Sequence, residues 1–194
     1  MTDLDTRPAT APAVEIADPG PLGLAGFAMT TFVLSVFNAH IVTVGSSVVL
    51  GLALAYGGGA QLLAGMWEFR KGNTFGAVAF SSYGAFWISF FLLVSFAKDA
   101  TPKSIGVYLL AWCIFTAYMT VAAMKTNLVV LAVFVALTLA FLFLAIGGLA
   151  NNETWTKVGG WVGLITAFLA WYGSFAVVTN STWKRTVLPV WPQG

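Results

Sequence analysis

The sequence predicts an all-α integral membrane protein, a bundle of six transmembrane helices. Two observations support this prediction. Of the 194 residues, 59% are hydrophobic and only 8% are charged, whereas a globular domain carries about 25% charged residues and uses them to cover its surface. The apolar residues also gather in six runs, each long enough to cross the hydrocarbon core as a helix of about 20 residues. Lipid is therefore the expected solvent for most of this chain.

The first three predicted helices are separated by short charged or turn-forming segments. The first helix, residues 22–44, follows the stretch Asp18-Pro19-Gly20-Pro21, in which an aspartate suits a helix start. The second helix, residues 47–69, ends where Arg70 and Lys71 introduce charge. The third helix, residues 74–97, stops at a Lys-Asp pair. These breaks leave each run as one uninterrupted apolar segment.

The last three predicted helices are separated in the same way. The fourth helix, residues 101–124, opens at Thr101-Pro102 and ends at the tight turn Lys125-Thr126-Asn127. The fifth helix, residues 128–150, is closed by an Asn-Asn-Glu stretch, and the sixth helix spans residues 155–180. All six runs are too long for strands and lack the alternation of a membrane barrel. Helices are favoured because each satisfies its own backbone hydrogen bonds in lipid.

These runs divide the chain into three parts. Residues 1–20 are rich in acids and prolines without the apolar core of a signal peptide, so they predict a disordered tail. Residues 21–180 form the predicted transmembrane domain, and residues 181–194 form a short second tail. Six spans place both termini on one side, which would hold six of the nine basic residues. The positive-inside rule therefore predicts a multi-pass protein of the plasma (inner) membrane with both termini in the cytoplasm.

The twenty glycines predict close helix packing. Helices associate in lipid by close backbone approach, which small residues permit. Small-residue faces are expected where Gly65 follows Gly57-Gly58-Gly59, at Gly72 with Gly76, and at Gly159 with Gly163. The three consecutive glycines also weaken the second helix, and loosened helices at membrane depth often line a substrate path.

The spans contain few ionisable residues, so no chain of acids or histidines can relay protons across them. Neutral polar side chains remain and can hydrogen-bond a carboxylate without carrying a charge. As a set they favour a polar path for a small solute, although each one alone is more easily explained by helix packing. The polar candidates for this path are Thr30, Thr31, Gln61, Asn73 and Thr74.

The composition argues against several functions. A net charge of +2 without a basic run does not indicate nucleic-acid binding. One histidine and one cysteine are too few for a metal centre, so neither a metal nor another cofactor is expected. Cys113 lies in an apolar run and is expected to pack. The catalytic groups of a membrane enzyme are missing, and we expect no enzymatic activity.

Several segments resemble the acetate uptake transporter family, which includes bacterial succinate–acetate permeases and fungal acetate and ammonia-export proteins. The stretch Asp18-Pro19-Gly20-Pro21-Leu22-Gly23-Leu24 is similar to the family signature Asn-Pro-Ala-Pro-Leu-Gly-Leu. Lys71-Gly72-Asn73-Thr74-Phe75-Gly76, Ser82-Tyr83-Gly84 and Arg185-Thr186-Val187-Leu188-Pro189 resemble later segments. The resemblance extends from Asp18 to Pro189, with Asp18 and Gly20 as departures from the signature.

The resemblance implies a homo-hexamer of six-helix protomers in the lipid bilayer, each with its own path for small monocarboxylates such as acetate, and also for lactate or the dicarboxylate succinate. It implies that Phe27, Tyr83 and Leu137 pinch this path, and that Pro21, Leu22 and Gly23 of the signature line it. Passage is expected to be either channel-like or proton-linked. The alternatives are a transporter or channel for another small solute such as ammonia, and a membrane sensor that transports nothing.

Overall fold

The computed structural model describes residues 16–193. Most of the predicted disordered tail, residues 1–15, lies outside the described part of the chain. Six segments are long and apolar enough to cross a membrane, which confirms the predicted helix bundle. In chain order the elements of this part are α1 (Gly20–Asn38), α2 (Val48–Leu54), η1 (Ala55–Ala60), α3 (Gln61–Lys71), α4 (Thr74–Phe96), α5 (Pro102–Ala123), α6 (Leu128–Ala150) and α7 (Glu153–Trp183).

The second span is one continuous helix with an irregular centre. The elements α2, η1 and α3 follow one another without a break, and η1 is a wider π-helical turn that contains the three glycines. Single π-helical turns inside α-helices are frequent at functional sites. The predicted weakening of this helix is therefore seen as a change of helical form rather than as a break.

Two predicted boundaries differ from the structure by three residues or more. The first helix ends at Asn38 instead of residue 44, because His40 takes a left-handed backbone with φ of 58° that a right-handed helix cannot continue. The last helix continues past residue 180 to Trp183 and contains 31 residues. Composition did not show either change, since residues 41–44 are as apolar as the helix before them, whereas α7 continues through the polar residues Asn180, Ser181 and Thr182.

Side-chain caps fix the starts of four helices. Asn73, Thr101, Asn127 and Asn152 each accept a hydrogen bond from a backbone N–H of the first turn of α4, α5, α6 and α7, respectively. These caps satisfy donors that a helix start otherwise leaves without a partner. Each break that the sequence places between spans is thus also a specific helix start.

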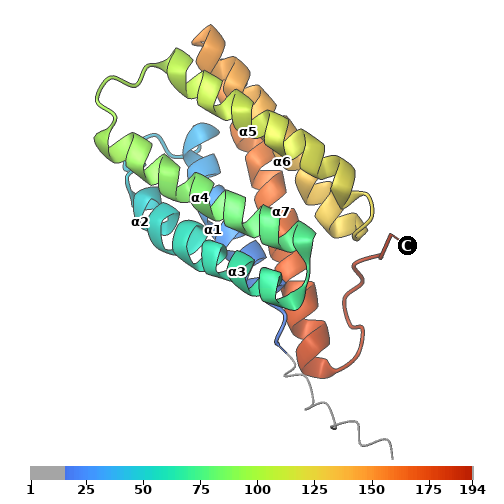
Figure 1. Ribbon diagram of the computed structural model, residues 1–194. Helices are drawn as coiled ribbons and strands as arrows, with labels where there is room; N and C mark the ends of the chain where they lie inside the picture. The colour runs from blue at the N-terminus through green and yellow to red at the C-terminus, as the bar shows by residue number, and fades with distance from the viewer. Residues whose placement is uncertain (1–15, 194) are drawn as a thin grey trace, which may run out of the picture.

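The helices pack as two groups with the first and last helices beside each other. The pair α5–α6 lies on one side of the molecule and α3–α4 on the other, with α1 and α7 behind them (Figure 1). The backbones of α4 and α5 approach each other at few points, and aromatic side chains fill the space between them. The ring centroid of Phe86 on α4 lies 5.1 Å from that of Trp112 on α5 and 5.3 Å from that of Phe141 on α6.

Glycines permit close approach at several helix contacts. A Cβ atom on Gly65 of α3 would lie 2.5 Å from the backbone nitrogen of Ser81 on α4, and one on Gly163 of α7 would lie 3.2 Å from Cβ of Ser35 on α1. These contacts agree with the predicted small-residue faces. The prediction for Gly72 was wrong, because this residue ends α3 with φ of +81° and no atom of residues 16–193 lies within 4 Å of an added Cβ. Its absent side chain serves the turn and not helix packing.

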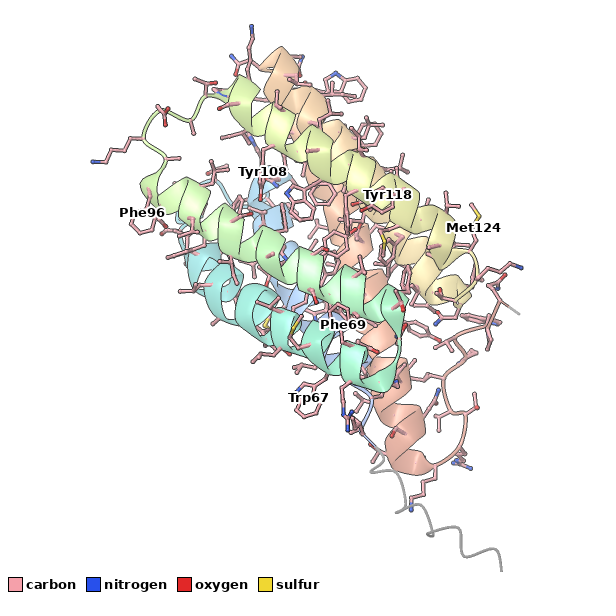
Figure 2. The ribbon with its side chains drawn as sticks, viewed as in Figure 1. Trp67, Phe69, Phe96, Tyr108, Tyr118 and Met124 are labelled. Carbon is pink, nitrogen blue, oxygen red and sulfur yellow. The ribbon has the colours of Figure 1, made fainter. Side chains whose placement is uncertain are left out.

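The outer surface of the bundle is apolar. Figure 2 shows Trp67 and Phe96 pointing away from the helices, and these side chains are 55% and 68% exposed. Phe69, at the end of α3, is 57% exposed. A soluble monomer rarely exposes apolar surface on this scale. Their exposure fits a bundle whose outside faces lipid or further protein.

Candidate functional site

A narrow cavity lies between the two helix groups. Its volume is about 20 Å³, which is room for about one water molecule. Helices α1, α3, α4 and α6 all contribute to its wall. The lining residues are Leu24, Phe27, Gln61, Ala79, Phe80, Tyr83, Val133, Phe134 and Leu137. We call this cavity the pinch, because it is too small for a solute with several non-hydrogen atoms until a side chain moves.

Three residues expected to constrict the path meet at the pinch. Phe27, Tyr83 and Leu137 come from α1, α4 and α6, and all are at most 5% exposed. The rings of Phe27 and Tyr83 lie 5.8 Å apart between centroids. On its other side, Tyr83 packs against Phe134 at 6.0 Å. The narrowing is therefore made of large side chains on different helices, and not of backbone.

A hydrogen bond to α5 holds Tyr83 in place. The Tyr83 hydroxyl lies 2.9 Å from Oγ1 of Thr116, which is fully buried. Thr116 has a single hydroxyl proton and donates it to the Trp112 carbonyl at 2.7 Å. Tyr83 must therefore be the donor in its bond to Thr116. Its proton is engaged within the protein, so the hydroxyl does not donate to a solute in this conformation.

This bond makes Thr116→Val a direct test of what fixes the pinch. Valine keeps the shape of threonine but cannot accept the Tyr83 proton, and leaving that buried donor without a partner costs about 1–3 kcal/mol. We expect lower thermal stability, faster passage of solutes and weaker discrimination by size. Thermal unfolding in detergent and flux in proteoliposomes measure these effects.

Thr166→Val is the matched control, because Thr166 is also fully buried and bonds only the Val162 carbonyl of its own helix, at 2.9 Å. Equal selectivity in the Thr116→Val and Thr166→Val proteins would show that the hydrogen bond does not position Tyr83.

A wider cavity of about 200 Å³ adjoins the pinch at the end of the bundle where α1 begins. It shares Leu24, Ala79, Phe80 and Phe134 with the pinch, so the two are continuous along their walls. We call this cavity the vestibule. Its polar lining includes Asp18, Glu68, Lys71, Asn73, Thr126 and Asn127. The vestibule has the size and the polarity to admit a small solute from water to the pinch.

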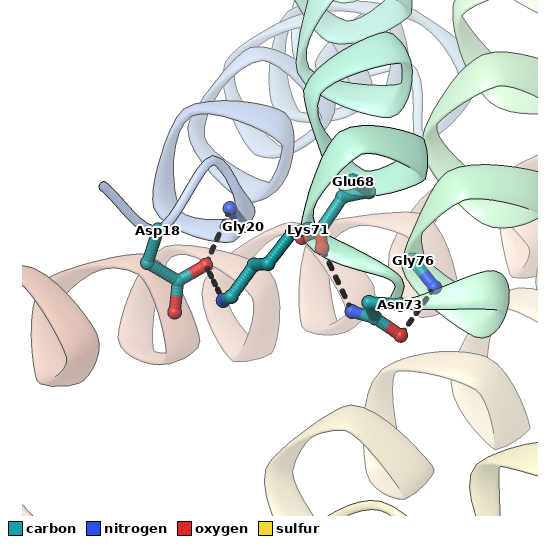
Figure 3. Close-up of polar contacts among 6 residues, drawn as sticks. All are labelled: Asp18, Gly20, Glu68, Lys71, Asn73 and Gly76. Atoms are coloured by element: carbon teal, nitrogen blue, oxygen red, sulfur yellow. Dashed lines mark hydrogen bonds and ion pairs between the residues drawn. The ribbon is translucent and has the colours of Figure 1, made fainter. Parts of the chain in front are cut away.

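Charged and polar residues of the vestibule are paired with one another (Figure 3). Lys71 Nζ lies 2.9 Å from Oδ1 of Asp18. The same Asp18 oxygen accepts a hydrogen bond from the Gly20 backbone N–H at 2.9 Å. Asn73 Nδ2 donates to Glu68 Oε2 at 2.9 Å, while Asn73 Oδ1 caps α4 by accepting from Gly76 N–H at 3.1 Å. The Asp18 carboxylate thus already occupies the helix start at which a bound carboxylate would be attracted.

Asp18→Asn is expected to change the electrostatics of the vestibule without changing the fold. Asparagine keeps an oxygen for the Gly20 N–H but leaves Lys71 without its counter-charge, so carboxylate anions should gather in the vestibule and be supplied faster for protonation and passage through the pinch. We expect flux to rise roughly two- to fivefold at low salt and to return toward wild type above 0.1 M salt, where screening acts within about 10 Å. Stability should change by less than about 1 kcal/mol, since the ion pair is partly exposed.

Asp99→Asn is the control for this prediction, because it removes an exposed carboxylate of the loop between α4 and α5 that lines neither the vestibule nor the hollow at the opposite end. Flux in proteoliposomes across a salt series is the measurement. The prediction is contradicted if both variants respond alike, or if the increase in the Asp18→Asn protein persists at high salt.

A further hollow of about 290 Å³ lies at the opposite end of the bundle. It is lined by the end of α1, the start of α5, the end of α6 and the start of α7, with Asn38, Asn152 and Thr156 among its polar residues. The aromatic cluster of Phe86, Trp112 and Phe141 lies in the core of the bundle. Each end of the bundle therefore carries a partly polar hollow.

The residues that the sequence predicted for the path lie in different places in the structure. Gln61 joins Phe27, Tyr83 and Leu137 at the pinch, while Pro21 and Asn73 line the vestibule. Leu22 lines an outer groove between α1 and α7. The other predicted residues line neither the pinch nor the vestibule. Gly23 packs on Phe80, and Thr30 donates a hydrogen bond to the Gly26 carbonyl. Thr31 is buried and Thr74 is exposed.

The site residues predicted from the sequence did not include two polar side chains that the structure brings to the site. Thr116 positions Tyr83 from α5, and Glu68, only 1% exposed, lines the vestibule. Both are polar residues on apolar helices, which was a visible signal. The sequence did not show that these side chains face the interior of the bundle, because a helix that is apolar on all sides has no apolar stripe to mark its inward face.

Comparison with known proteins identifies the family. The model of the GPR1/FUN34/yaaH family matches residues 2–193. The chain belongs to the GPR1/FUN34/yaaH family. As a member of this family with six apolar spans, it is a multi-pass membrane protein.

Individual members of the GPR1/FUN34/yaaH family are similar over most of the chain. The succinate-acetate/proton symporter SatP of Escherichia coli is 40% identical over 181 residues, which cover 91% of this chain and 96% of SatP. The ammonia transport outward protein 2 of Saccharomyces cerevisiae is 43% identical over 184 residues, 89% of this chain; the chain spans 65% of that relative's length. A solved structure of the bacterial acetate channel SatP superposes with a TM-score of 0.87 at 39% identity, covering 91% of this chain and 99% of that one. The six-helix fold is thus the fold of a known family member.

Proposed function

We propose that this protein passes small carboxylates, the monocarboxylate acetate foremost and also lactate or the dicarboxylate succinate, across the membrane through the vestibule and the pinch. The observation that supports this most directly is the meeting of Phe27, Tyr83 and Leu137 at one narrow cavity that adjoins a polar vestibule. The names of its relatives, a succinate-acetate/proton symporter and an acetate channel, support the same substrates. They also favour transport over catalysis.

The pinch selects by size and by charge. Its volume of about 20 Å³ excludes acetate until a side chain moves, so passage requires a transient opening. An anion in this mostly apolar ring loses its hydration without a compensating cation, which costs far more than moving a neutral molecule there. The protonated acid should therefore pass more easily, and flux should rise as the external solution becomes more acidic. Phe27 and Leu137 set the size limit, and Tyr83 shapes the opening.

Labelled acetate uptake into proteoliposomes, with and without an imposed pH gradient, tests this function. Uptake above that of empty liposomes is expected. Accumulation with the gradient beyond the diffusion of acetic acid in empty liposomes would support a proton-linked carrier, whereas equilibration alone would support a channel. No excess uptake in either condition would reject monocarboxylates as the solute.

A second candidate solute is ammonia. The yeast relative named as an ammonia transport outward protein is 43% identical to this chain, and the apolar pinch would admit a small neutral molecule as readily as a neutral acid. Stopped-flow measurement of internal pH after an ammonium jump separates the two solutes. Equal rates in empty and protein-containing liposomes would exclude ammonia as a solute, and carboxylate transport would then be the remaining function.

We further propose a homo-hexamer in the plasma (inner) membrane with both termini in the cytoplasm, each protomer holding its own path. The many exposed apolar side chains leave area for contacts between protomers. Basic residues support the orientation, since Arg70, Lys71 and Lys125 lie at the end of the bundle that holds both termini. The mass of the complex in detergent tests the assembly. Labelling of single introduced cysteines with an impermeant maleimide tests the orientation, because the native Cys113 is only 7% exposed.

A further inference from the structure

The pinch contains one polar group that nothing else in the site explains. Gln61 is 1% exposed and lines the pinch, and its Oε1 atom has no hydrogen-bond partner within residues 16–193. Apart from Tyr83, whose hydroxyl is engaged by Thr116, the other side chains that line this cavity are apolar. Buried polar atoms are nearly always hydrogen-bonded, so an unpaired carboxamide at the narrowest point of the path requires a reason.

The backbone around Gln61 is built to place it there. Gln61 is the first residue after the π-helical turn η1, whose extra residue rotates the following helix relative to a regular one. The glycines of this turn let it lie against its neighbours: a Cβ on Gly57 would lie 2.8 Å from Thr30 Cβ on α1, and one on Gly58 would lie 2.8 Å from Ile88 Cγ1 on α4. A π-turn is less favourable than a regular turn and is frequent at functional sites. Here its position sets the direction of Gln61.

The chemistry of the carboxamide indicates what it binds. Its NH₂ group donates and its oxygen accepts, side by side in one plane. A protonated carboxylic acid offers the complementary pair, a carbonyl acceptor and an O–H donor. A carboxylate has acceptors only, so it would leave the Gln61 oxygen unpaired beside a negative charge. A primary amide offers the same acceptor and donor as the neutral acid.

We propose that Gln61 is the recognition group of the pinch and that it accepts a small planar head with one acceptor and one donor, which is the neutral carboxylic acid and also a small primary amide such as acetamide. The proposal rests on the proposed function for the position of the path. It adds a substrate class, small primary amides, and it assigns discrimination between acid and anion to one side chain.

The charges of the vestibule are consistent with a neutral solute. The positive charge of Lys71 is paired with the carboxylate of Asp18. The other ionisable group in the cavity lining is the carboxyl group of Glu68, which cannot be positively charged. The approach to Gln61 therefore carries no excess positive charge to draw an anion to the pinch. A neutral acid or amide crosses the vestibule without electrostatic cost.

The test is competition against labelled acetate uptake in proteoliposomes at acid pH. Acetamide and acetone have nearly the same size and shape, but acetone has no donor for the Gln61 oxygen. In wild type we expect acetamide to compete about tenfold more strongly than acetone, the value of roughly one hydrogen bond. In Gln61→Met, which keeps the length of the side chain, this preference should disappear. Gln193→Met, at the exposed second glutamine, should retain it.

Each outcome is decisive. Equal competition by acetamide and acetone in wild type overturns the proposal and needs no variant, so a folding defect in Gln61→Met cannot obscure it. A preference that survives in well-folded Gln61→Met, as judged by gel filtration, also overturns it. If wild type takes up no acetate, the proposed function fails and labelled acetamide uptake decides: entry that depends on Gln61 supports the recognition group, and entry no faster than in empty liposomes rejects it.

Discussion

Replacing Phe27 by alanine is expected to raise the passage of longer monocarboxylates, such as butyrate, about tenfold or more relative to acetate, since each methylene in a tight apolar pocket discriminates by roughly 1–3 kcal/mol. Phe27 is 4% exposed and its ring closes one side of the pinch against Tyr83. Removing the ring enlarges a cavity that now holds about one water molecule. Uptake of labelled acids of increasing length in proteoliposomes measures the change.

Phe32→Ala is the matched control for this prediction. Phe32 lies on the same helix but packs against Phe168 and Trp171 of α7, with ring centroids 5.7 Å and 5.1 Å away, and it does not line the pinch. Both variants remove a phenyl ring, and each is expected to lose stability. If Phe32→Ala widens the size range as much as Phe27→Ala does, or if neither does, the pinch is not the selective element.

The second large effect concerns stability, and it is expected for Gly160→Ala. A Cβ on this residue of α7 would lie 2.6 Å from the carbonyl carbon of Asn38 and 2.8 Å from Cα of Ala39 at the end of α1. Both neighbours are backbone, so the helices must separate to admit one methyl group. Overpacking of this kind costs about 1–3 kcal/mol. Thermal unfolding of the purified protein in detergent should show a clear decrease in Tm.

Gly51→Ala provides the contrast, because Gly51 lies on α2 and, in the described part of the chain, no atom lies within 4 Å of an added Cβ. Alanine is the better helix former by about 1 kcal/mol, so this variant should be as stable as wild type or more stable. Unfolding of both variants at the same temperature would contradict this prediction. Flux of acetate in the Gly160→Ala protein would then show whether the contact between α1 and α7 also shapes the path.

The sequence predicted the number and positions of the spans well, and the physical reason is simple. Lipid admits long apolar helices, so charged breaks such as Lys98-Asp99 mark their ends directly. The fifth predicted helix, residues 128–150, coincides with α6. The predicted end of the first helix was wrong by six residues, because a left-handed residue at His40 leaves no mark in composition.

The candidate site was harder to predict from the sequence than the transmembrane helices. The α6 helix is apolar throughout, so only resemblance pointed to Leu137, and only the structure places it in the same cavity as Phe27 and Tyr83. The roles of these residues stay predictions until flux is measured. Pairings such as Tyr83 with Thr116 join residues 33 positions apart on helices that barely approach. No local pattern encodes such a contact, because it depends on how the helix groups are set against each other.

The contact between the first and last helices has a consequence for biogenesis. Ser174 of α7 donates a hydrogen bond to the Pro21 carbonyl at 2.7 Å, across 153 positions of sequence. Helix α1 carries Phe27 and emerges early from the ribosome, yet its main packing partner is synthesised last. Contacts so distant in sequence form late, after the chain between them is in place. The solute path should therefore form only when synthesis is complete, because a chain interrupted before α7 lacks the helix against which α1 packs most extensively and would leave no sealed conduit in the membrane.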